Sequence, residues 1–418
     1  MSSATRARAL LASIAVALLV ACARPAMRAP PPAPAAHATL RAGTSGDYAP
    51  LSIWKGDRVE GFAPALIAAF ASREHLEVSW TRFRWPGLTE DLRGGRFDLA
   101  ADGITVRPER SIAGRFTVPI ARGGAVLLVR RAVGLQLGAL DRPGLRVVVN
   151  QGGHLERVAR GLFRAAALRV IPDNEAVRVA FAQGEADAAL TNTFEAPGWA
   201  AGVADVEQLG PLTQDVTAIW VRADRAELAD RLDAWLLDQE ERGELASLRT
   251  RWLGAGGGPR AASPVSALLA ATAERLALMP FVADAKRRTG MAVEDTTQEE
   301  RVITASANAV AHAAQERGQP APRRELVDAF FRAQIEAAKA VQQRDTPAAP
   351  AATYALDADL RPAIARISAR MARLAVRVPR GTDRAAVIAE ARVDLAGTGL
   401  ASESIDRIGA ALAALAAP

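Results

Sequence analysis

Hydrophobic residues follow two different patterns along the 418-residue chain. Between residues 39 and 254, short runs rich in β-branched residues alternate with stretches of helical periodicity, which predicts α/β sheets with parallel strands. The expected strands are 40–44, 76–80, 125–131, 145–150, 168–172, 187–191 and 217–221. The expected helices are 62–74, 86–94, 154–167, 175–184 and 225–252.

The β-rich pattern ends after residue 263, and the rest of the chain is Ala-rich with amphipathic helical periodicity. Prolines and a Pro/Ala-rich stretch at 346–352 separate the helical segments. The expected helices are 264–289, 297–317, 323–344, 357–377 and 382–415. We therefore predict a multidomain chain, in which an α/β domain over 39–254 is joined by a flexible linker at 255–263 to an all-α domain over 264–418.

The N-terminus is typical of a targeting segment. Two arginines are followed by an apolar stretch from Ala9 to Ala21, which is too short to span a bilayer. The sequence Leu19–Cys22 resembles a bacterial lipobox, in which the cysteine thiol is diacylated and becomes the first residue of the mature protein. We therefore expect residues 1–22 to be a lipoprotein-type signal peptide, with Cys22 as the lipidation site.

Ordinary signal cleavage after the small-x-small sequence Ala21–Ala23 is the competing interpretation. Cys22 is the only cysteine of the chain, which favours lipidation. In both cases the mature protein lies outside the cytoplasm, so we expect a periplasmic location, with a lipid anchor as the single membrane contact. Residues 23–38 are rich in Pro and Ala and predict a stiff tether between the anchor and the first domain.

Charge and composition narrow the classes of partner. The formal net charge is +6, from 52 basic and 46 acidic residues, and no basic run is interleaved with aromatic residues, so nucleic acid is not an expected partner. A single cysteine excludes a disulfide within the chain, and the four scattered histidines lack the spacing of metal ligands. We expect neither a metal nor an organic cofactor, and a homo-oligomer is left open.

A series of short motifs in the first domain indicates ligand binding. In chain order it comprises Gly46-Asp47-Tyr48, Gly61-Phe62, Trp85-Pro86, Phe97-Asp98-Leu99, Gly103-Ile104-Thr105, Pro108-Glu109-Arg110 and Phe116-Thr117. This order resembles the type 3 family of extracellular solute-binding proteins over nearly all of residues 39–254. The resemblance implies two lobes with the ligand between them, joined by crossovers near 122–128 and 210–218. It also implies that Arg110 binds the ligand carboxylate, for which a guanidinium is well suited.

A second group of motifs resembles one enzymatic subgroup of that family, cyclohexadienyl dehydratase, which converts prephenate to phenylpyruvate or arogenate to phenylalanine. The motifs are Asn150-Gln151-Gly152-Gly153, Pro172-Asp173-Asn174 and Thr191-Asn192-Thr193-Phe194-Glu195-Ala196. The reaction requires anchors for two carboxylates, which Arg110 and the glycine loop at a helix N-terminus can provide. It also requires a protonated acid near the leaving hydroxyl. The resemblance implies that Glu195 is this acid, because a glutamate in a desolvated cleft has a raised pKa.

Three positions in the cleft depart from the family pattern. His154 stands where the dehydratase loop has threonine, and Ala125 stands where a lysine is expected. Asn192 replaces the aspartate that holds the ligand ammonium in amino-acid binders, and an uncharged amide favours a keto acid over an α-amino acid. The substrate-binding set that the resemblance implies is Asp47, Tyr48, Trp85, Thr105, Arg110, Asn150, Gly152, Gly153, His154 and Asn192.

The C-terminal helices contain a different set of motifs. These are Glu274-Arg275-Leu276, Val282-Ala283-Asp284-Ala285-Lys286, Val293-Glu294-Asp295, Phe331-Arg332-Ala333-Gln334-Ile335, Ala340-Val341-Gln342 and Leu360-Arg361. They resemble the secreted, all-helical chorismate mutases of the gamma class. Arg275 and Lys286 are 11 residues apart, close to three turns, and therefore share a face of the expected helix. Ala338 and Gln342 share a face of another helix.

Chorismate rearranges without covalent catalysis, so an enzyme must hold a dianion in a chair-like conformer and stabilise the charge that develops on the ether oxygen. The resemblance implies that Arg275 and Arg361 bind the carboxylates. It implies equally that Lys286 and Gln342 face the ether oxygen. Asp295 would meet the ring hydroxyl.

The helical domain also departs from its family pattern. Gln298 stands where the family has arginine, and Ala338 stands where it has serine or threonine. Arg301, one turn further along the same face, is the candidate replacement for the missing guanidinium.

The two resemblances describe consecutive reactions, because chorismate mutase makes prephenate and the dehydratase consumes it. We therefore predict a bifunctional periplasmic enzyme of phenylalanine biosynthesis, an isomerase and a lyase, with chorismate and prephenate as its substrates. The alternative is a non-catalytic domain that binds a carboxylate ligand, fused to an active or degenerate mutase. The choice between prephenate and arogenate is left open.

Overall fold

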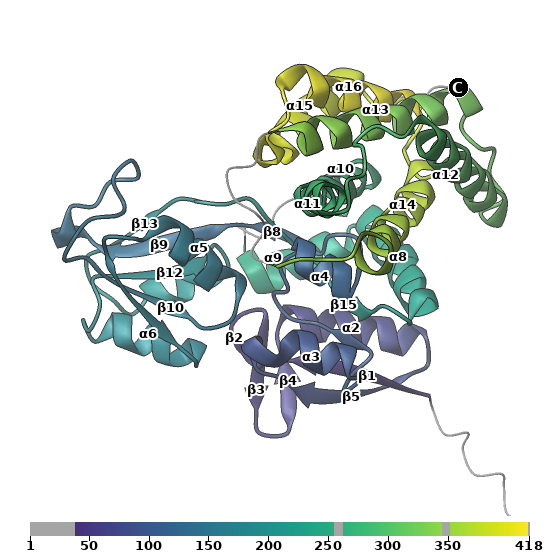
Figure 1. Cartoon of the computed structure of the whole chain (residues 1–418). Coiled ribbons are helices and arrows are strands. Elements are labelled where there is room, and N and C mark those ends of the chain that lie inside the picture. Colours follow the sequence, from purple (N-terminus) through teal and green to yellow (C-terminus); the bar gives the residue numbers. More distant parts are fainter. Residues whose placement is uncertain (1–37, 255–261, 345–351, 417–418) are drawn as a thin grey trace, which may run out of the picture. The chain divides into compact units, whose positions relative to one another are not determined.

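The computed structural model describes residues 38–254, 262–344 and 352–416. The expected signal peptide with Cys22, the tether up to residue 37 and most of the linker lie outside the described residues. Residues from Thr39 onward form one compact unit. Figure 1 shows two groups of strands in its first half, followed by helices α10 to α16 with no strand among them. The fold class predicted from the sequence is thus confirmed.

The first lobe is built on a five-stranded sheet with the order β5-β1-β6-β15-β7. β1 pairs in parallel with β5 and β6, whereas β15 is antiparallel to both β6 and β7. The expectation of parallel sheets is therefore wrong at β15, because this strand enters the sheet from the crossover and has no preceding helix. The bounds are β1 Thr39–Thr44, β5 Glu77–Arg82, β6 Leu99–Ala100, β7 Gly114–Phe116 and β15 Trp220–Arg222.

The second lobe repeats this arrangement with the order β11-β10-β12-β9-β13. β10 pairs in parallel with β11 and β12, and β9 is antiparallel to β12 and β13. β9 also follows a crossover directly, which explains its reversed direction. The bounds are β9 Ala125–Arg130, β10 Arg146–Asn150, β11 Ala167–Ile171, β12 Ala188–Asn192 and β13 Val206–Leu209.

Two crossovers join the lobes and pair with each other. β8, Ala121–Gly123, is antiparallel to β14, Asp215–Thr217, so that Asp215 lies opposite Gly123. The strand expected at 217–221 is accordingly divided between β14 in the crossover and β15 in the first sheet. A small sheet follows β1 and consists of β2 Asp47–Tyr48, β3 Ser52–Lys55 and β4 Arg58–Glu60.

Helices follow the strands much as the periodicity predicts. The segment expected as one helix over 225–252 is two helices, because Gly243 has a left-handed φ of 76° that ends the first. Helix α5 ends at Leu162, and the next residue is extended toward β11. The bounds are α2 Phe62–Arg73, η1 Trp85–Gly87, α3 Leu88–Arg93, α4 Pro108–Ala113, η2 Arg131–Val133, α5 His154–Leu162, α6 Asn174–Ala182, α7 Ala196–Ala200, α8 Ala226–Glu241 and α9 Glu244–Leu253.

The helical domain has two more breaks than the sequence predicts. Pro280 lies at the start of α11 and separates it from α10, because proline has no N–H to continue a helix. Gly399, with a φ of 71°, lies between α15 and α16. The bounds are α10 Pro264–Ala277, α11 Met279–Thr289, α12 Thr296–Glu316, α13 Arg324–Gln343, η4 Leu356–Leu360, α14 Arg361–Ala375, α15 Arg384–Asp394, η5 Ala396–Thr398 and α16 Ser402–Ala414.

Helix α10 is a core element of this unit. The stretch Pro264–Thr289 is long and apolar enough to cross a membrane, but 78% of its most apolar window is buried inside the protein, as expected for a core helix. Glu274 of α10 forms a buried ion pair with Arg370 of α14 and accepts a 2.7 Å hydrogen bond from Ser111 of α4. These contacts tie the helices to the first lobe.

Candidate functional site

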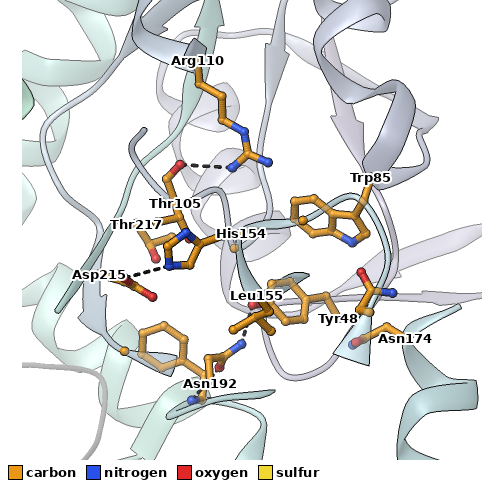
Figure 2. Close-up of a pocket in the computed structure, with 15 residues that line it drawn as sticks. Tyr48, Trp85, Thr105, Arg110, His154, Leu155, Asn174, Asn192, Asp215 and Thr217 are labelled. Atoms are coloured by element: carbon orange, nitrogen blue, oxygen red, sulfur yellow. Dashed lines mark hydrogen bonds and ion pairs between the residues drawn. The ribbon is translucent and has the colours of Figure 1, made fainter. Parts of the chain in front are cut away.

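A cavity of about 550 Å³, including the part open to solvent, lies between the two lobes. Its walls combine a few aromatic side chains with amides, hydroxyls and one guanidinium, as is usual for a small-molecule site. Figure 2 shows the side chains that line it. They are Tyr48, Trp85, Gly103, Thr105, Arg110, Gly124, Asn150, Gly153, His154, Leu155, Asn174, Asn192, Phe194, Asp215 and Thr217.

Arg110 is the cation of this cavity. It lies in α4, which begins at a proline, and its side chain is buried. One guanidinium N–H group donates to the main-chain oxygen of Thr105 at 3.1 Å, and the guanidinium carbon lies 5.9 Å from the Trp85 ring centroid. No described carboxylate lies within 4.0 Å of the guanidinium, and its Nε has no hydrogen-bond partner among the described residues. Burial lowers the pKa of Arg110 well below its usual value. A carboxylate ligand would supply the partner that this buried cation lacks.

The glycine loop joins β10 to α5 and approaches the first lobe closely. Gly152 has a φ of 76°, and a Cβ at this position would lie 2.7 Å from the ring of Pro86. Only glycine fits such a position without strain. The Gly152 N–H donates to Glu156 at 2.6 Å, and Gly153 lines the cavity. The loop therefore brings the N-terminus of α5 to the cavity wall.

His154 is the first residue of α5, and its imidazole contacts the crossover strand β14. Its Nε2 lies 3.0 Å from Oδ1 of Asp215, and both side chains are largely buried and line the cavity. Nδ1 of His154 is buried and has no hydrogen-bond partner among the described residues. Figure 2 shows this pair beside the space that Arg110 and Trp85 also face.

Glu195 lies behind the cavity wall. Its carboxylate is fully buried and accepts hydrogen bonds from Asn174 Nδ2 at 2.6 Å, Thr191 Oγ1 at 2.7 Å and Asn192 Nδ2 at 3.2 Å. Burial raises the pKa of Glu195 to about 8, and the hydrogen bonds from Thr191 and Asn174 offset only part of that effect. Glu195 is therefore mostly protonated at neutral pH, which a general acid requires.

Two asparagines connect Glu195 to the cavity and to the opposite lobe. The Asn192 side-chain oxygen accepts the main-chain N–H groups of Phe194 and Glu195, which fixes the amide so that its Nδ2 also donates to the Tyr48 hydroxyl. Asn174 Nδ2 donates to Glu195 and, at 3.1 Å, to the main-chain oxygen of Asp47. The bond from Asn174 to Asp47 and the bond from Asn192 to Tyr48 each connect the second lobe to the first.

A second cluster of polar side chains lies in the helical domain around Arg275. Arg275 is buried in α10 and donates to the main-chain oxygen of Gln334 at 3.0 Å. Burial lowers its pKa to about 10, and no carboxylate of the described residues lies within 4.0 Å of it. Gln334 is itself buried and donates to Thr272 at 3.1 Å, and its side-chain oxygen has no hydrogen-bond partner among the described residues. The helical domain thus also holds a buried cation suited to an anionic ligand.

Lys286 of α11 lies near two other residues of the predicted set. Its Nζ donates to the main-chain oxygen of Val293 at 2.8 Å. Burial lowers the pKa of Lys286. The carboxylate of Asp295 counteracts this effect, whereas the positive charge of Arg361 adds to it. Asp295 also caps α12 by accepting the Gln298 N–H at 2.9 Å. Arg361 begins α14, is nearly half exposed and pairs with an aspartate one turn before it, Asp357.

Gln342 is weakly held at the end of α13. Its Nε2 donates to the main-chain oxygen of Ala338 at 3.3 Å and faces the Met279 sulfur at 3.5 Å, and its side-chain oxygen is buried without a partner among the described residues. An amide with so few strong bonds can rotate toward a ligand at low cost. Arg275 and Lys286 lie on successive helices, α10 and α11, because the single helix expected to carry both is interrupted at Leu278.

The structure places Arg301 on the exposed outer face of α12, where it lines a shallow groove with Thr297, Glu300 and Thr304. The more buried cation beside this part of α12 is Lys339 of α13, whose Nζ lies 3.2 Å from a carboxylate oxygen of Glu299. The sequence pattern did not single out Lys339, which is the residue directly after Ala338.

Comparison with known proteins places the chain in a family. Residues 40–255, which are 216 of the 418 residues, match the bacterial extracellular solute-binding proteins, family 3. The chain belongs to this family. Residues 266–343 match chorismate mutase type II, so this solute-binding protein has a chorismate mutase domain after its two lobes.

Several relatives of the two-lobed domain are known. Cyclohexadienyl dehydratase of Pseudomonas aeruginosa is 32% identical over 161 residues, which are 38% of this chain and 60% of the relative. Arginine-binding extracellular protein ArtP of Bacillus subtilis is 26% identical over 218 residues, 50% of this chain and 84% of the relative. The crystal structure of an ancestral amino-acid-binding protein, a precursor of cyclohexadienyl dehydratase, covers 51% of this chain and 95% of its own at 27% identity and a TM-score of 0.48. The match to the Pseudomonas dehydratase spans only three fifths of that protein's length.

Most of the candidate cleft residues of this solute-binding protein meet at one cavity. Asp47, Gly152 and Glu195 are the predicted residues that do not line it: Asp47 bonds Asn174 through its main chain, and Gly152 packs on Pro86. The predicted residues in the cavity wall are Tyr48, Trp85, Thr105, Arg110, Asn150, Gly153, His154 and Asn192. Lining residues that were not predicted are Gly103, Gly124, Leu155, Asn174, Phe194, Asp215 and Thr217.

Proposed function

We propose that the chain is a bifunctional enzyme, in which the helical domain converts chorismate to prephenate and the cleft of the two-lobed domain converts prephenate to phenylpyruvate. The observation that carries the second activity is Glu195, a buried glutamate whose pKa of about 8 keeps it protonated beside an anion-binding cavity. The relatives support the same proposal, because one of them is a cyclohexadienyl dehydratase.

The dehydratase step needs one proton and no cofactor. The bond between the ring and its carboxylate breaks, and CO₂ leaves while that electron pair enters the ring. The C–O bond of the ring hydroxyl breaks at the same time, and the proton from Glu195 makes the leaving group water. Arg110 would hold a carboxylate of the substrate, and the N–H groups around Gly153 could take up the other.

The position of Glu195 sets a condition on this mechanism. Asn174 and Asn192 line the cavity and lie between its space and the carboxyl group, with hydrogen bonds of 2.6 and 3.2 Å to it. Direct proton transfer therefore requires that one amide swing aside. Asn174 is the better candidate, because the Asn192 amide is also held through its side-chain oxygen by the main-chain N–H groups of Phe194 and Glu195.

The same position of Glu195 favours a second candidate function, a carboxylate-binding module without catalysis. A glutamate sealed by asparagines could serve only to hold Asn174 and Asn192 in place. Ala125, where the dehydratase pattern has a lysine, is fully buried in β9 and supplies no charge to the cavity. The experiments below separate the two functions.

The mutase step needs cations and hydrogen-bond donors in place before the substrate arrives. Arg275 would bind a chorismate carboxylate, and its lack of a described ion-pair partner supports this role. Lys286 has three N–H groups, of which one is given to the Val293 oxygen, so two could bind the ether oxygen. Gln342 would provide a second donor there. Arg361, nearly half exposed at the start of α14, could close over the other carboxylate.

Purified mature chain supplied with chorismate should release phenylpyruvate, with prephenate as a transient intermediate. The products can be separated and identified by liquid chromatography and mass spectrometry. If prephenate accumulates and decays only at its spontaneous rate, this would contradict the dehydratase and support the binding module. Unchanged chorismate would contradict the mutase assignment.

We also propose a periplasmic location with a lipid anchor at Cys22, supported by the lipobox-like sequence Leu19–Cys22. Mass spectrometry of the mature N-terminus should find Cys22 as the first residue, with the mass of the attached acyl chains. The multiple chains of a lipoprotein anchor a protein firmly, whereas one chain binds weakly. Cys22→Ser should release the protein from the membrane fraction. An unmodified chain that starts at Arg24 would rule out the anchor.

A further inference from the structure

The cavity between the lobes contains one carboxylate among the described residues that line it, that of Asp215. This carboxylate is engaged: the His154 imidazole lies 3.0 Å from its Oδ1, and the two side chains are 18% and 12% exposed. No other described side chain forms an ion pair with Asp215. Among the described residues of the wall, Arg110 is therefore the one charged group that is left for a ligand.

The contact between His154 and Asp215 affects whether the cleft prefers a ligand with an ammonium group or a ligand with a keto group. An α-amino acid needs an acceptor of negative charge for its ammonium, and a desolvated ammonium without one is costly. Among the lining residues, Asp215 is the acceptor that could serve, because Asn174 and Asn192 are uncharged amides. An imidazole in contact with Asp215 occupies one of its carboxylate oxygens, so this oxygen is not available to a ligand ammonium. A keto oxygen, by contrast, only accepts hydrogen bonds and needs no carboxylate.

The placement of His154 suits it to this role. It follows Gly152 and Gly153 and begins α5, so its backbone is fixed by the loop that packs on Pro86. Asp215 holds the ring through Nε2, and the buried Nδ1 has no partner among the described residues.

We infer that the His154–Asp215 pair makes the cleft select a 2-oxo acid over the corresponding 2-amino acid. His154 acts as the specificity residue, and Asp215 is the latent ammonium site that it covers. This inference rests on the proposed function for the class of ligand, an aromatic carboxylate. It assigns prephenate, rather than arogenate, as the preferred substrate of the dehydratase.

The test uses two probes that differ only at C2, phenylpyruvate and L-phenylalanine, with dissociation constants measured by calorimetry on the full mature chain. The parent should bind phenylpyruvate more tightly. His154→Thr uncovers Asp215 and should shift the ratio of the two constants toward L-phenylalanine by roughly tenfold or more, as expected for one desolvated charge pair. His154→Ser gives the same test if the threonine variant does not fold.

Three further variants make the result specific. Adding Asp215→Asn to His154→Thr should remove the gain in L-phenylalanine affinity, because no carboxylate then remains in the wall. His154→Gln should keep the parental ratio, since its amide can still donate to Asp215. His312→Thr changes a histidine that is 70% exposed on α12 and serves as the matched control, with an unchanged ratio.

A ratio that stays at the parental value in His154→Thr, or a gain for L-phenylalanine that survives Asp215→Asn, would overturn the inference. Prephenate turnover, measured on the same samples, distinguishes this failure from that of the proposed function. If the parent turns over prephenate but His154→Thr leaves the ratio of the two dissociation constants unchanged, only the selectivity is contradicted. A shifted ratio without turnover in the parent contradicts the dehydratase and leaves the selectivity supported.

Discussion

Glu195→Gln should reduce the conversion of prephenate to phenylpyruvate by roughly 10²–10⁴-fold, the range that a positioned acid contributes. Glutamine has the size of glutamic acid and can still bond to its neighbours, but it has no proton to give to the leaving hydroxyl. Prephenate affinity should change little, because Arg110 and the glycine loop hold the carboxylates. The measurements are the rate of phenylpyruvate formation and, separately, the dissociation constant of prephenate.

The pH profile of the parent provides an independent signature of Glu195. Burial raises its pKa to about 8, so the protonated, active form is present below that pH and is lost as the pH rises through it. The dehydratase rate should therefore fall on the alkaline side near pH 8. In Glu195→Gln the small residual rate should lose this dependence.

A matched control separates loss of the acid from a general effect of removing a glutamate. Glu207 lies in β13 of the same lobe and pairs on the surface with Arg131. Glu207→Gln should turn over prephenate at the parental rate. Parental turnover in Glu195→Gln would show that this glutamate only supports Asn174 and Asn192. Prephenate binding without turnover in the parent would identify the first domain as a binding module.

The sequence predicted the fold class and the order of the two domains, and both are confirmed. Periodicity failed where one residue interrupts a helix, as at Gly243 and Gly399, whose left-handed φ angles cannot be read from hydrophobic spacing. It also failed at β9 and β15, because the direction of a strand depends on the crossovers and not on its own residues. These features are set by tertiary connections.

The cleft was predicted best where its residues belong to local motifs. Arg110 and Trp85 come from such motifs and meet at one cavity, with the guanidinium 5.9 Å from the ring centroid. Asp215 was missed because it lies in a crossover strand 61 residues after His154, where no local pattern marks it. Glu195 was expected in the wall and lies behind it, because the depth of a side chain depends on neighbours such as Asn174.

Lys286→Ala should lower the rate of chorismate rearrangement by roughly 10²–10³-fold, the usual value of one preorganised donor to developing negative charge. The loss should appear mainly in kcat, because the ether oxygen gains its charge only in the transition state, whereas Arg275 binds the substrate carboxylate throughout. The measurement is the disappearance of chorismate absorbance, with KM determined in parallel.

Lys55→Ala is the control, since Lys55 lies in β3 of the first lobe, is mostly exposed and pairs with Glu60. It should rearrange chorismate at the parental rate. Lys286→Ala should still convert added prephenate to phenylpyruvate, because the cleft is intact, while Glu195→Gln should turn chorismate into prephenate that accumulates. This reciprocal pair of outcomes requires two independent active sites on one chain. Rearrangement of chorismate by Lys286→Ala at the parental rate would show that Lys286 does not contact the ether oxygen.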